Sequence, residues 1–146
     1  MKLTSFTDYS LRVLIYLAAA PSRRATIAEI ATAFDVSENH LTKVVHLLGK
    51  QGWIETLRGK GGGMQLAKAP EDICIGKVVR STEGPDLPAE CFALDGGNCL
   101  ISGSCKLRRA LAEAMTAFYA VLDDYTLADI SRNRRVLGKV LMIQPA

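Results

Sequence analysis

The sequence has little of what marks several special classes of protein. Aromatic residues make up 6% of its 146 residues, with only 12 glycines, five prolines and four cysteines. These values exclude collagen, low-complexity disorder and disulfide-dense miniproteins. No apolar run reaches the ~18 residues that a membrane-spanning helix needs. With 49% apolar and 23% charged residues, the chain is typical of a folded, soluble domain.

One short apolar segment, residues 13–20, superficially resembles a secretory signal. The residues before it include Asp8 as well as Lys2 and Arg12, so the purely basic leader of such a signal is missing. We therefore expect a cytoplasmic protein with no membrane partner. In that compartment, clustered cysteines more often bind metals or carry redox chemistry than form structural disulfides.

The sequence has only two histidines, which argues against several kinds of active site. His40 and His46 are six residues apart, so they do not share a helix face as a metal-binding pair at i, i+4 does. No other histidine is left to act as a general base. Cys105 is a candidate nucleophile, but the sequence places no histidine or carboxylate to activate it. We therefore predict that the protein is not an enzyme.

Positive charge is also scarce, since the formal net charge is only +3. Its distribution is uneven. Residues 1–66 contain eight Lys or Arg and five Asp or Glu, whereas residues 67–146 contain ten of each. Eight minus five places the whole excess of three in the first half, where it can form a local basic surface.

Helix signals in that first half form a helix-turn-helix pattern. A helix is predicted over residues 5–20, with Ser5 as its N-cap and an acidic residue three positions later. A second helix begins at Thr26 with Glu29 in a capping box. After a brief turn, Ser37 caps a third helix that runs to about residue 50. Two short helices joined in this way are typical of DNA-binding proteins.

A small β-hairpin is predicted directly after the third helix. The strand-like residues 53–57 and 64–66 flank the turn Arg58-Gly59-Lys60-Gly61-Gly62-Gly63. This wing, at about residues 53–67, completes a winged helix-turn-helix domain that we place at residues 1–83, with a short helix over 75–83. The glycine run is not a nucleotide-binding loop, because it lacks the GxxxxGK[ST] spacing.

The second half is predicted to contain an irregular loop and a long helix. Residues 84–105 have no helical or strand period and hold three of the four cysteines, so we interpret them as a functional loop. A helix follows over about 104–124 and begins the C-terminal segment 105–146. Its apolar residues step by four and three, as in a coiled-coil seam: Leu107, Leu111, Ala114, Phe118, Val121 and Tyr125. The predicted fold class is mainly α.

The third predicted helix has one apolar face and one face suited to DNA. On a helical wheel, Leu41, Val44, Val45 and Leu48 lie opposite the polar residues Asn39, Thr42, Lys43, His46 and Lys50. Ser37 and His40 lie nearer its N-terminus, and Arg58 and Lys60 lie at the wing tip. Such side chains donate to base edges or phosphates, and wing-tip cations suit a minor groove. The alternative is a solvated surface, which the helix-turn-helix and the basic wing disfavour.

The cysteine loop has the spacing C-x7-C-x5-C, formed by Cys91, Cys99 and Cys105. Zinc sites favour paired cysteines two to four residues apart, which this loop lacks. Three thiolates on a glycine-rich loop favour an iron–sulfur cluster, with zinc, thiol redox chemistry or no ligand as alternatives. Cys105 lies near the start of the long helix, capped by Ser102 or Ser104, where the helix dipole favours a thiolate.

Cys74 is the obvious candidate for a fourth ligand. It alternates with Ile73 and Ile75, which is the pattern of a small buried side chain. We therefore interpret Cys74 as a core residue. A four-iron cluster held by the loop then needs an oxygen, a nitrogen or a small molecule as its fourth ligand.

Four segments together resemble the NsrR family of nitric-oxide-sensing repressors, part of a wider family of dimeric winged-helix regulators that includes IscR. They are residues 1–9 (MKLTSFTDY), the wing turn RGKGGG, the three-cysteine loop and residues 125–130 (YTLADI). The resemblance extends over nearly the whole chain. One departure is the Cys91–Cys99 gap, which is longer than we expect because it contains the additional residues 95–98.

The resemblance implies a homodimer joined along the long helix, and a 4Fe–4S cluster held by Cys91, Cys99 and Cys105. It also implies that Asp8 of the partner subunit is the fourth ligand. Arg12 lies one turn further along the same predicted helix, where it either orients that carboxylate or is an ordinary surface charge. Relatives with 2Fe–2S clusters leave the nuclearity open, with 4Fe–4S favoured. The implied function is repression at an inverted-repeat operator on double-stranded DNA, with DNA affinity lost when nitric oxide attacks the cluster. The alternative is a winged-helix regulator whose 2Fe–2S cluster or structural zinc senses redox or iron status.

Overall fold

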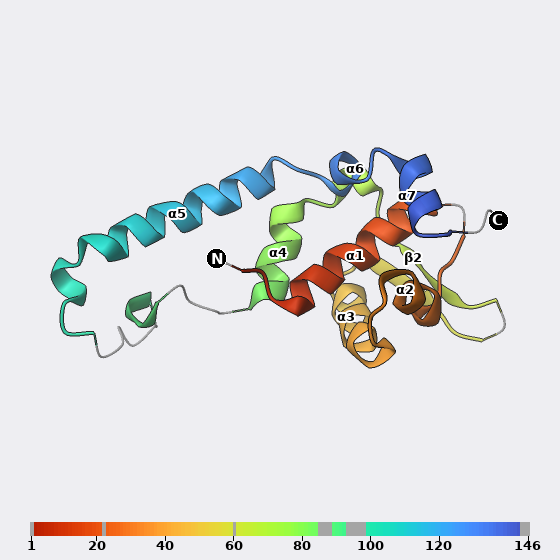
Figure 1. The fold of residues 1–146 in the computed structure, drawn as a ribbon, viewed down its shortest axis with the longest axis horizontal. Coiled ribbons are helices and arrows are strands. Elements are labelled where there is room, and N and C mark those ends of the chain that lie inside the picture. Colours follow the sequence, from red (N-terminus) through yellow and green to blue (C-terminus); the bar gives the residue numbers. More distant parts are fainter. Residues whose placement is uncertain (1, 22, 60, 85–88, 93–98, 144–146) are drawn as a thin grey trace.

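A computed structural model describes residues 2–21, 23–59, 61–84, 89–92 and 99–143 (Figure 1). The prediction of a mainly helical fold with one small hairpin is confirmed. The helices are α1 (Ser5–Ala19), α2 (Ile27–Phe34), α3 (Glu38–Lys50), α4 (Ile75–Glu83), α5 (Lys106–Asp123), α6 (Leu127–Ile130) and α7 (Arg134–Val140). The strands are β1 (Ile54–Leu57) and β2 (Gly63–Leu66), and short 3-10 helices are η1 (Pro70–Asp72), η2 (Glu90–Phe92) and η3 (Ser102–Ser104).

The helix caps agree with the sequence at α2 and differ at α1. Thr26 and Glu29 form the predicted capping box of α2. The prediction of Ser5 as the cap of α1 is wrong, because Thr4 is the N-cap and its hydroxyl accepts from the Thr7 N–H. Thr4 also donates its N–H and its hydroxyl to Glu83 Oε1, at 2.9 and 3.1 Å. This contact with the end of α4 decides which of two neighbouring hydroxyl residues caps the helix.

The wing is an antiparallel hairpin that is tied to the segment before α2. Strand β1 pairs with β2 in a register from Ile54 opposite Leu66 to Leu57 opposite Gly63. Ala25 exchanges two backbone hydrogen bonds with Met64, at 2.7 and 2.9 Å. Gly63 has φ +141°, and a Cβ there would lie 2.9 Å from the Ala25 carbonyl oxygen. Glycine is therefore required at this close approach.

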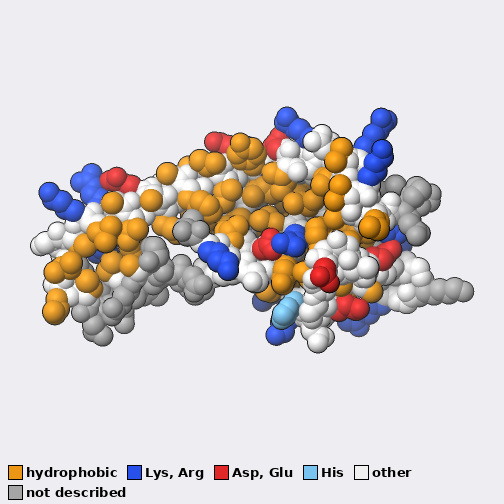
Figure 2. Space-filling model, in the orientation of Figure 1, with side chains coloured by type: hydrophobic (Ala, Val, Ile, Leu, Met, Phe, Trp, Pro, Cys, Tyr) orange, Lys and Arg blue, Asp and Glu red, His pale blue; other side chains and the backbone are white. Residues whose placement is uncertain are grey.

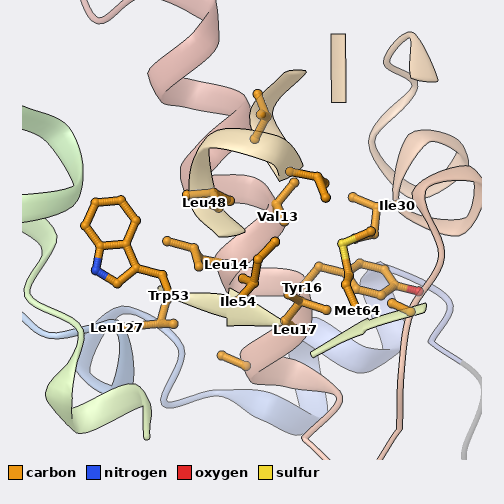
Figure 3. Close-up of a cluster of buried hydrophobic side chains, with 14 of the residues drawn as sticks. Val13, Leu14, Tyr16, Leu17, Ile30, Leu48, Trp53, Ile54, Met64 and Leu127 are labelled. Atoms are coloured by element: carbon orange, nitrogen blue, oxygen red, sulfur yellow. The ribbon is translucent and has the colours of Figure 1, made fainter. Parts of the chain in front are cut away.

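We call α1–α4 together with the hairpin the winged-helix body. Its core surrounds α1, which runs through the middle of this body (Figure 3). Val13 and Leu14 of α1 are fully buried and pack with Leu48 of α3 and Ile54 of β1. The apolar segment that imitates a signal sequence is thus the central core helix. Among the described residues, no helix has the length and apolar character needed to cross a membrane.

Helix α5 extends away from the winged-helix body as an arm (Figure 1). Near its C-terminal end it packs beside α4, where Phe118, Tyr119 and Leu122 are half-buried against the core. None of its residues is fully buried. Leu107 and Val121 of the predicted seam are 65% and 58% exposed, and Figure 2 shows a band of hydrophobic side chains along this arm.

The chain returns from α5 to the body through α6 and α7. Thr126 and Asp129 form a second capping box, at α6. The sequence pattern did not predict α7, whose Leu137 packs against the core beside α1. The segment is short and has no side-chain cap, so its helical state depends on this tertiary contact.

Candidate DNA interface and cysteine loop

Helix α3 presents the predicted polar face to solvent. Its four apolar residues Leu41, Val44, Val45 and Leu48 are buried against the core. All seven predicted contact residues of the helix are exposed: Ser37, Asn39, His40, Thr42, Lys43, His46 and Lys50. The hydroxyl of Thr42 donates to the Glu38 carbonyl at 2.8 Å. Thr42 therefore presents an acceptor, while the other side chains supply donors.

His40 contacts α1 in addition to facing solvent. Its ring stacks on Tyr9, with centroids 6.1 Å apart and planes 24° from parallel. A pocket of about 180 Å³ lies at this contact, lined by Ser5, Phe6, Tyr9, His40 and Lys43. The first turn of α3 is thereby in contact with the first turns of α1, next to Asp8 in the sequence.

The wing presents one predicted cation to solvent, and the fold adds another next to the wing. Arg58 is exposed after β1, while Lys60 lies outside the described residues. Arg24 is also exposed and directly precedes Ala25, which pairs with the wing strand β2. No local sequence pattern indicates Arg24, because that pairing joins residues 39 positions apart.

The three loop cysteines lie at the far end of α5 from the winged-helix body. Cys91 is buried within η2, and Cys99 and Cys105 are partly exposed. Cys105 itself is the N-cap of α5 and makes no capping hydrogen bond through its side chain. The prediction that Ser102 or Ser104 caps this helix is therefore wrong. The additional residues of the Cys91–Cys99 gap lie outside the described residues.

The donor set at this end suits an iron–sulfur cluster. All four cysteines are free thiols, and cysteine thiolates are the side chains that hold iron–sulfur clusters. The Arg108 guanidinium lies 5.8 Å from the Phe92 ring centre and links α5 to the segment around Cys91. Within the described part of one chain, however, no three Cys, His, Asp or Glu side chains gather as a metal site.

Asp8, the expected fourth ligand, is paired with Arg12 one turn along α1. The two side chains make contacts of 2.7 and 3.1 Å and are about 44% and 39% exposed. The Arg12 guanidinium also lies 5.9 Å from the Tyr9 ring centre and 5.6 Å from that of Phe34. Asp8 is thus accessible, and its ion-pair partner is held by aromatic rings of α1 and α2.

Cys74 is not the core residue that its sequence neighbours suggest. It is only partly buried, and its thiol points to Asp123, with Sγ 3.6 Å from Oδ1. It caps α4 beside the C-terminal end of α5, whereas Cys105 caps the opposite end. Because α5 has 18 residues, those ends are about 27 Å apart. Cys74 therefore cannot join Cys105 at one cluster within a single chain.

Residues 3–133 match the Rrf2 family, described as iron-dependent transcriptional regulators. The chain belongs to the Rrf2 family. It is 49% identical over 145 residues to the HTH-type transcriptional regulator NsrR of Bacillus subtilis, with 99% of each chain covered. It is 51% identical over 142 residues to that of Geobacillus kaustophilus, with 97% of each covered. These relatives confirm the resemblance to NsrR-type regulators.

Solved structures of Rrf2 regulators share the fold. The structure of CymR, the global cysteine regulator of B. subtilis, has a TM-score of 0.68 and 28% identity, covering 90% of this chain and 97% of the other. IscR of T. potens has a TM-score of 0.71 and 25% identity, covering 91% and 88%. The predicted fold class is thereby confirmed, and the chain is a DNA-binding transcriptional regulator.

Proposed function

We propose that this NsrR-type regulator is a homodimeric repressor that responds to nitric oxide through an iron–sulfur cluster, for which we favour 4Fe–4S. The ligands are Cys91, Cys99, Cys105 and Asp8 of the partner subunit. The observation that carries the proposal is the placement of the thiols. They lie at the end of α5 that is distant from α1 of the same chain, and α5 has large apolar side chains exposed along its length. Helix α1 in turn presents the accessible carboxylate of Asp8.

The exposed face of α3 supports double-stranded DNA as the partner. Its exposed donors, and the exposed Arg58 and Arg24 at the wing, fit winged-helix proteins that place a recognition helix in the major groove. Two such surfaces in a symmetric dimer read an inverted repeat, because operator symmetry follows protein symmetry.

The apolar band on α5 supports a dimer. Large apolar side chains such as Leu107 and Val121 are mostly exposed in the single chain. Contiguous exposed apolar surface of this kind marks an interface, and the heptad-like spacing fits a second copy of the same helix. In such a dimer, the distal end of each α5 is available to the winged-helix body of the other subunit.

Cys91, Cys99 and Cys105 supply three thiolates, and an aspartate of the partner subunit completes the set with oxygen. When bound, the cluster supplies iron that reacts with nitric oxide, most readily where the ligand is not a thiolate. The chain's own contribution is the contact path that begins at Asp8. Asp8 pairs with Arg12, Arg12 lies over Tyr9, and Tyr9 stacks on His40 of α3. A change in the partner of Asp8 therefore acts on residues that touch the recognition helix.

Anaerobic purification tests the metal assignment. We expect a brown protein containing iron and acid-labile sulfide, and we expect Cys91→Ser, Cys99→Ser and Cys105→Ser each to lose both. Cys74→Ser is the matched control and should keep them, because Cys74 lies at the other end of α5. A colourless zinc protein would reject the cluster in favour of structural zinc, and sulfide retained in all three loop variants would reject the ligand set.

A further inference from the structure

The C-terminal end of α5 is fastened to the start of α4 by a short set of contacts. The backbone N–H of Ile75 donates to the Tyr125 carbonyl at 2.9 Å, and the N–H of Leu127 donates to the Ile73 carbonyl at 2.8 Å. These two bonds attach the segment after α5 to the body. They leave the direction of α5 to be set by side chains.

Two charged side chains join α5 to α4 directly. Arg80 of α4 donates from both terminal nitrogens to the two carboxylate oxygens of Asp123, each at 2.6 Å. The same guanidinium lies 4.5 Å from the ring centre of Tyr119, one turn earlier on α5. The Cys74 thiol donates to the same carboxylate. We call Arg80, Asp123 and Tyr119 the α4–α5 clamp.

Gly76 leaves room for the clamp. A Cβ at this position would overlap Asp123 Oδ1 and lie 3.0 Å from the Asp123 backbone nitrogen. Any larger residue therefore forces the carboxylate away from Arg80 or pushes the end of α5 away from α4. The close approach of the two helices thus depends on a missing side chain.

The geometry of this pair matters more than its contribution to stability. Arg80 and Asp123 are 43% and 42% exposed, and exposed ion pairs contribute little to the free energy of unfolding. A bidentate guanidinium–carboxylate pair is nevertheless planar and directional. Hydrogen bonds from Arg80 hold the pKa of the Asp123 carboxyl below its usual range, so the pair stays charged at neutral pH.

Helix α5 acts as a lever on this junction. Its 18 residues span about 27 Å. A tilt of about 10° at the clamp therefore moves the Cys105 end by about 5 Å relative to the body, using that helix length. In DNA, 5 Å is more than one base-pair step of about 3.4 Å. A small tilt at the clamp thus moves the Cys105 end by a distance that is large compared with the precision needed for ligand positions and half-site spacing.

From these contacts, we infer that Arg80 and Asp123 are positioning residues that fix the angle between α5 and the winged-helix body. That angle sets the distance at which the dimer reads its two DNA half-sites. It also sets the alignment of each cysteine loop with the opposite subunit. The inference on DNA spacing rests on the proposed dimeric DNA-binding function, whereas the inference on the angle concerns the chain alone.

A distance measurement by pulsed electron paramagnetic resonance tests the angle. Non-natural residues that carry spin labels replace the exposed Gln51 at the end of α3 and Lys106 at the start of α5. Labelled chains are diluted with unlabelled chains, so that the measured distance lies within one chain. We expect Arg80→Gln and Gly76→Ala to broaden or shift the distribution of distances between the two labels, compared with the labelled chain without these substitutions. Arg109→Ala is the control, because Arg109 pairs with Glu113 within α5. Unchanged distance distributions in both Arg80→Gln and Gly76→Ala would overturn the inference, and Arg80→Gln decides alone if Gly76→Ala does not fold.

DNA binding by the same variants, unlabelled, tests the consequence. The unsubstituted protein selects a duplex from a random pool, and the spacing between its half-sites is then varied in single base-pair steps. We expect a sharp optimum for the unsubstituted protein and for Arg109→Ala, and a flattened or displaced optimum for Arg80→Gln, with the dimer mass unchanged. An identical optimum in Arg80→Gln contradicts the role in spacing. If the unsubstituted protein binds no DNA, the proposed function fails and the distance measurement still decides the role of the clamp.

Discussion

Replacement of Lys43 by alanine is the sharpest test of the DNA surface. Lys43 is exposed on α3, beside the pocket between α3 and α1, and a symmetric dimer carries two copies. If each copy contacts a phosphate, the slope of log affinity against log salt concentration falls by about 0.9 per contact, or about 1.8 per dimer. If each copy instead contacts a guanine, the loss is about 1–3 kcal/mol per contact, or about 2–6 kcal/mol per dimer.

Fluorescence anisotropy with the selected duplex, from about 50 to 200 mM salt, distinguishes these cases. A phosphate contact predicts a shallower slope and weaker binding to every sequence, whereas a guanine contact predicts a loss confined to the preferred sequence. Lys139→Ala is the matched control, because it removes the same charge from an exposed position on α7, on the opposite side of the body from α3 (Figure 1). An affinity and a slope equal to those of the control would refute the assignment of this face.

Asp8, Leu107 and Glu29 each allow a separate test. Asp8→Ala should make the cluster more labile or uncouple it from DNA binding. Anaerobic absorbance decay and a DNA titration check this, and unchanged behaviour in both would remove Asp8 from the ligand set. Leu107→Asp should shift the mass in solution from dimer to monomer by light scattering, because it places a charge in the exposed seam, and a mass still equal to the dimer would show that the interface lies elsewhere. Burial raises the pKa of Glu29, but hydrogen bonds from Thr26 and Arg23 outweigh it and hold the pKa below the ordinary 4.5. Glu29 therefore stabilises the fold above about pH 4.5, and this stabilisation is lost as the pH falls through the lowered pKa. Glu29→Gln keeps the capping box. Urea denaturation should therefore show a lower free energy of unfolding for Glu29→Gln than for the unsubstituted protein at pH 7, and no such difference near pH 3. An equal difference at both pH values would contradict this.

Local signals predicted the elements whose causes are local. The capping box at Thr26 lies where the sequence places it, and the apolar and polar faces of α3 follow from helical periodicity alone. The hairpin was predictable because two strand-like runs flank a glycine-rich turn. The predicted coiled-coil seam leaves large apolar side chains exposed in one chain, which is why it indicates a partner.

The features that the sequence did not predict share a different cause, which is contact between residues far apart in the chain. Thr4 rather than Ser5 caps α1 because Glu83, 79 positions from Thr4, accepts from it. Cys74 looks like a core residue between two isoleucines, but Asp123 draws its thiol to the surface. Arg80 and Asp123 are 43 residues apart, so no helical or strand period could pair them. Such contacts depend on the fold as a whole, and only the structure reveals them.

In the proposed function, nitric oxide acts at the cysteine loop and thereby controls DNA binding through α3. The most direct test is the affinity of the anaerobically purified, iron- and sulfide-containing dimer for its selected duplex, measured by anisotropy before and after stoichiometric addition of nitric oxide. We expect tight binding before addition and a marked loss of affinity afterwards, with Cys74→Ser behaving in the same way. Equal affinity before and after addition, in a protein whose cluster absorbance has changed, would contradict it.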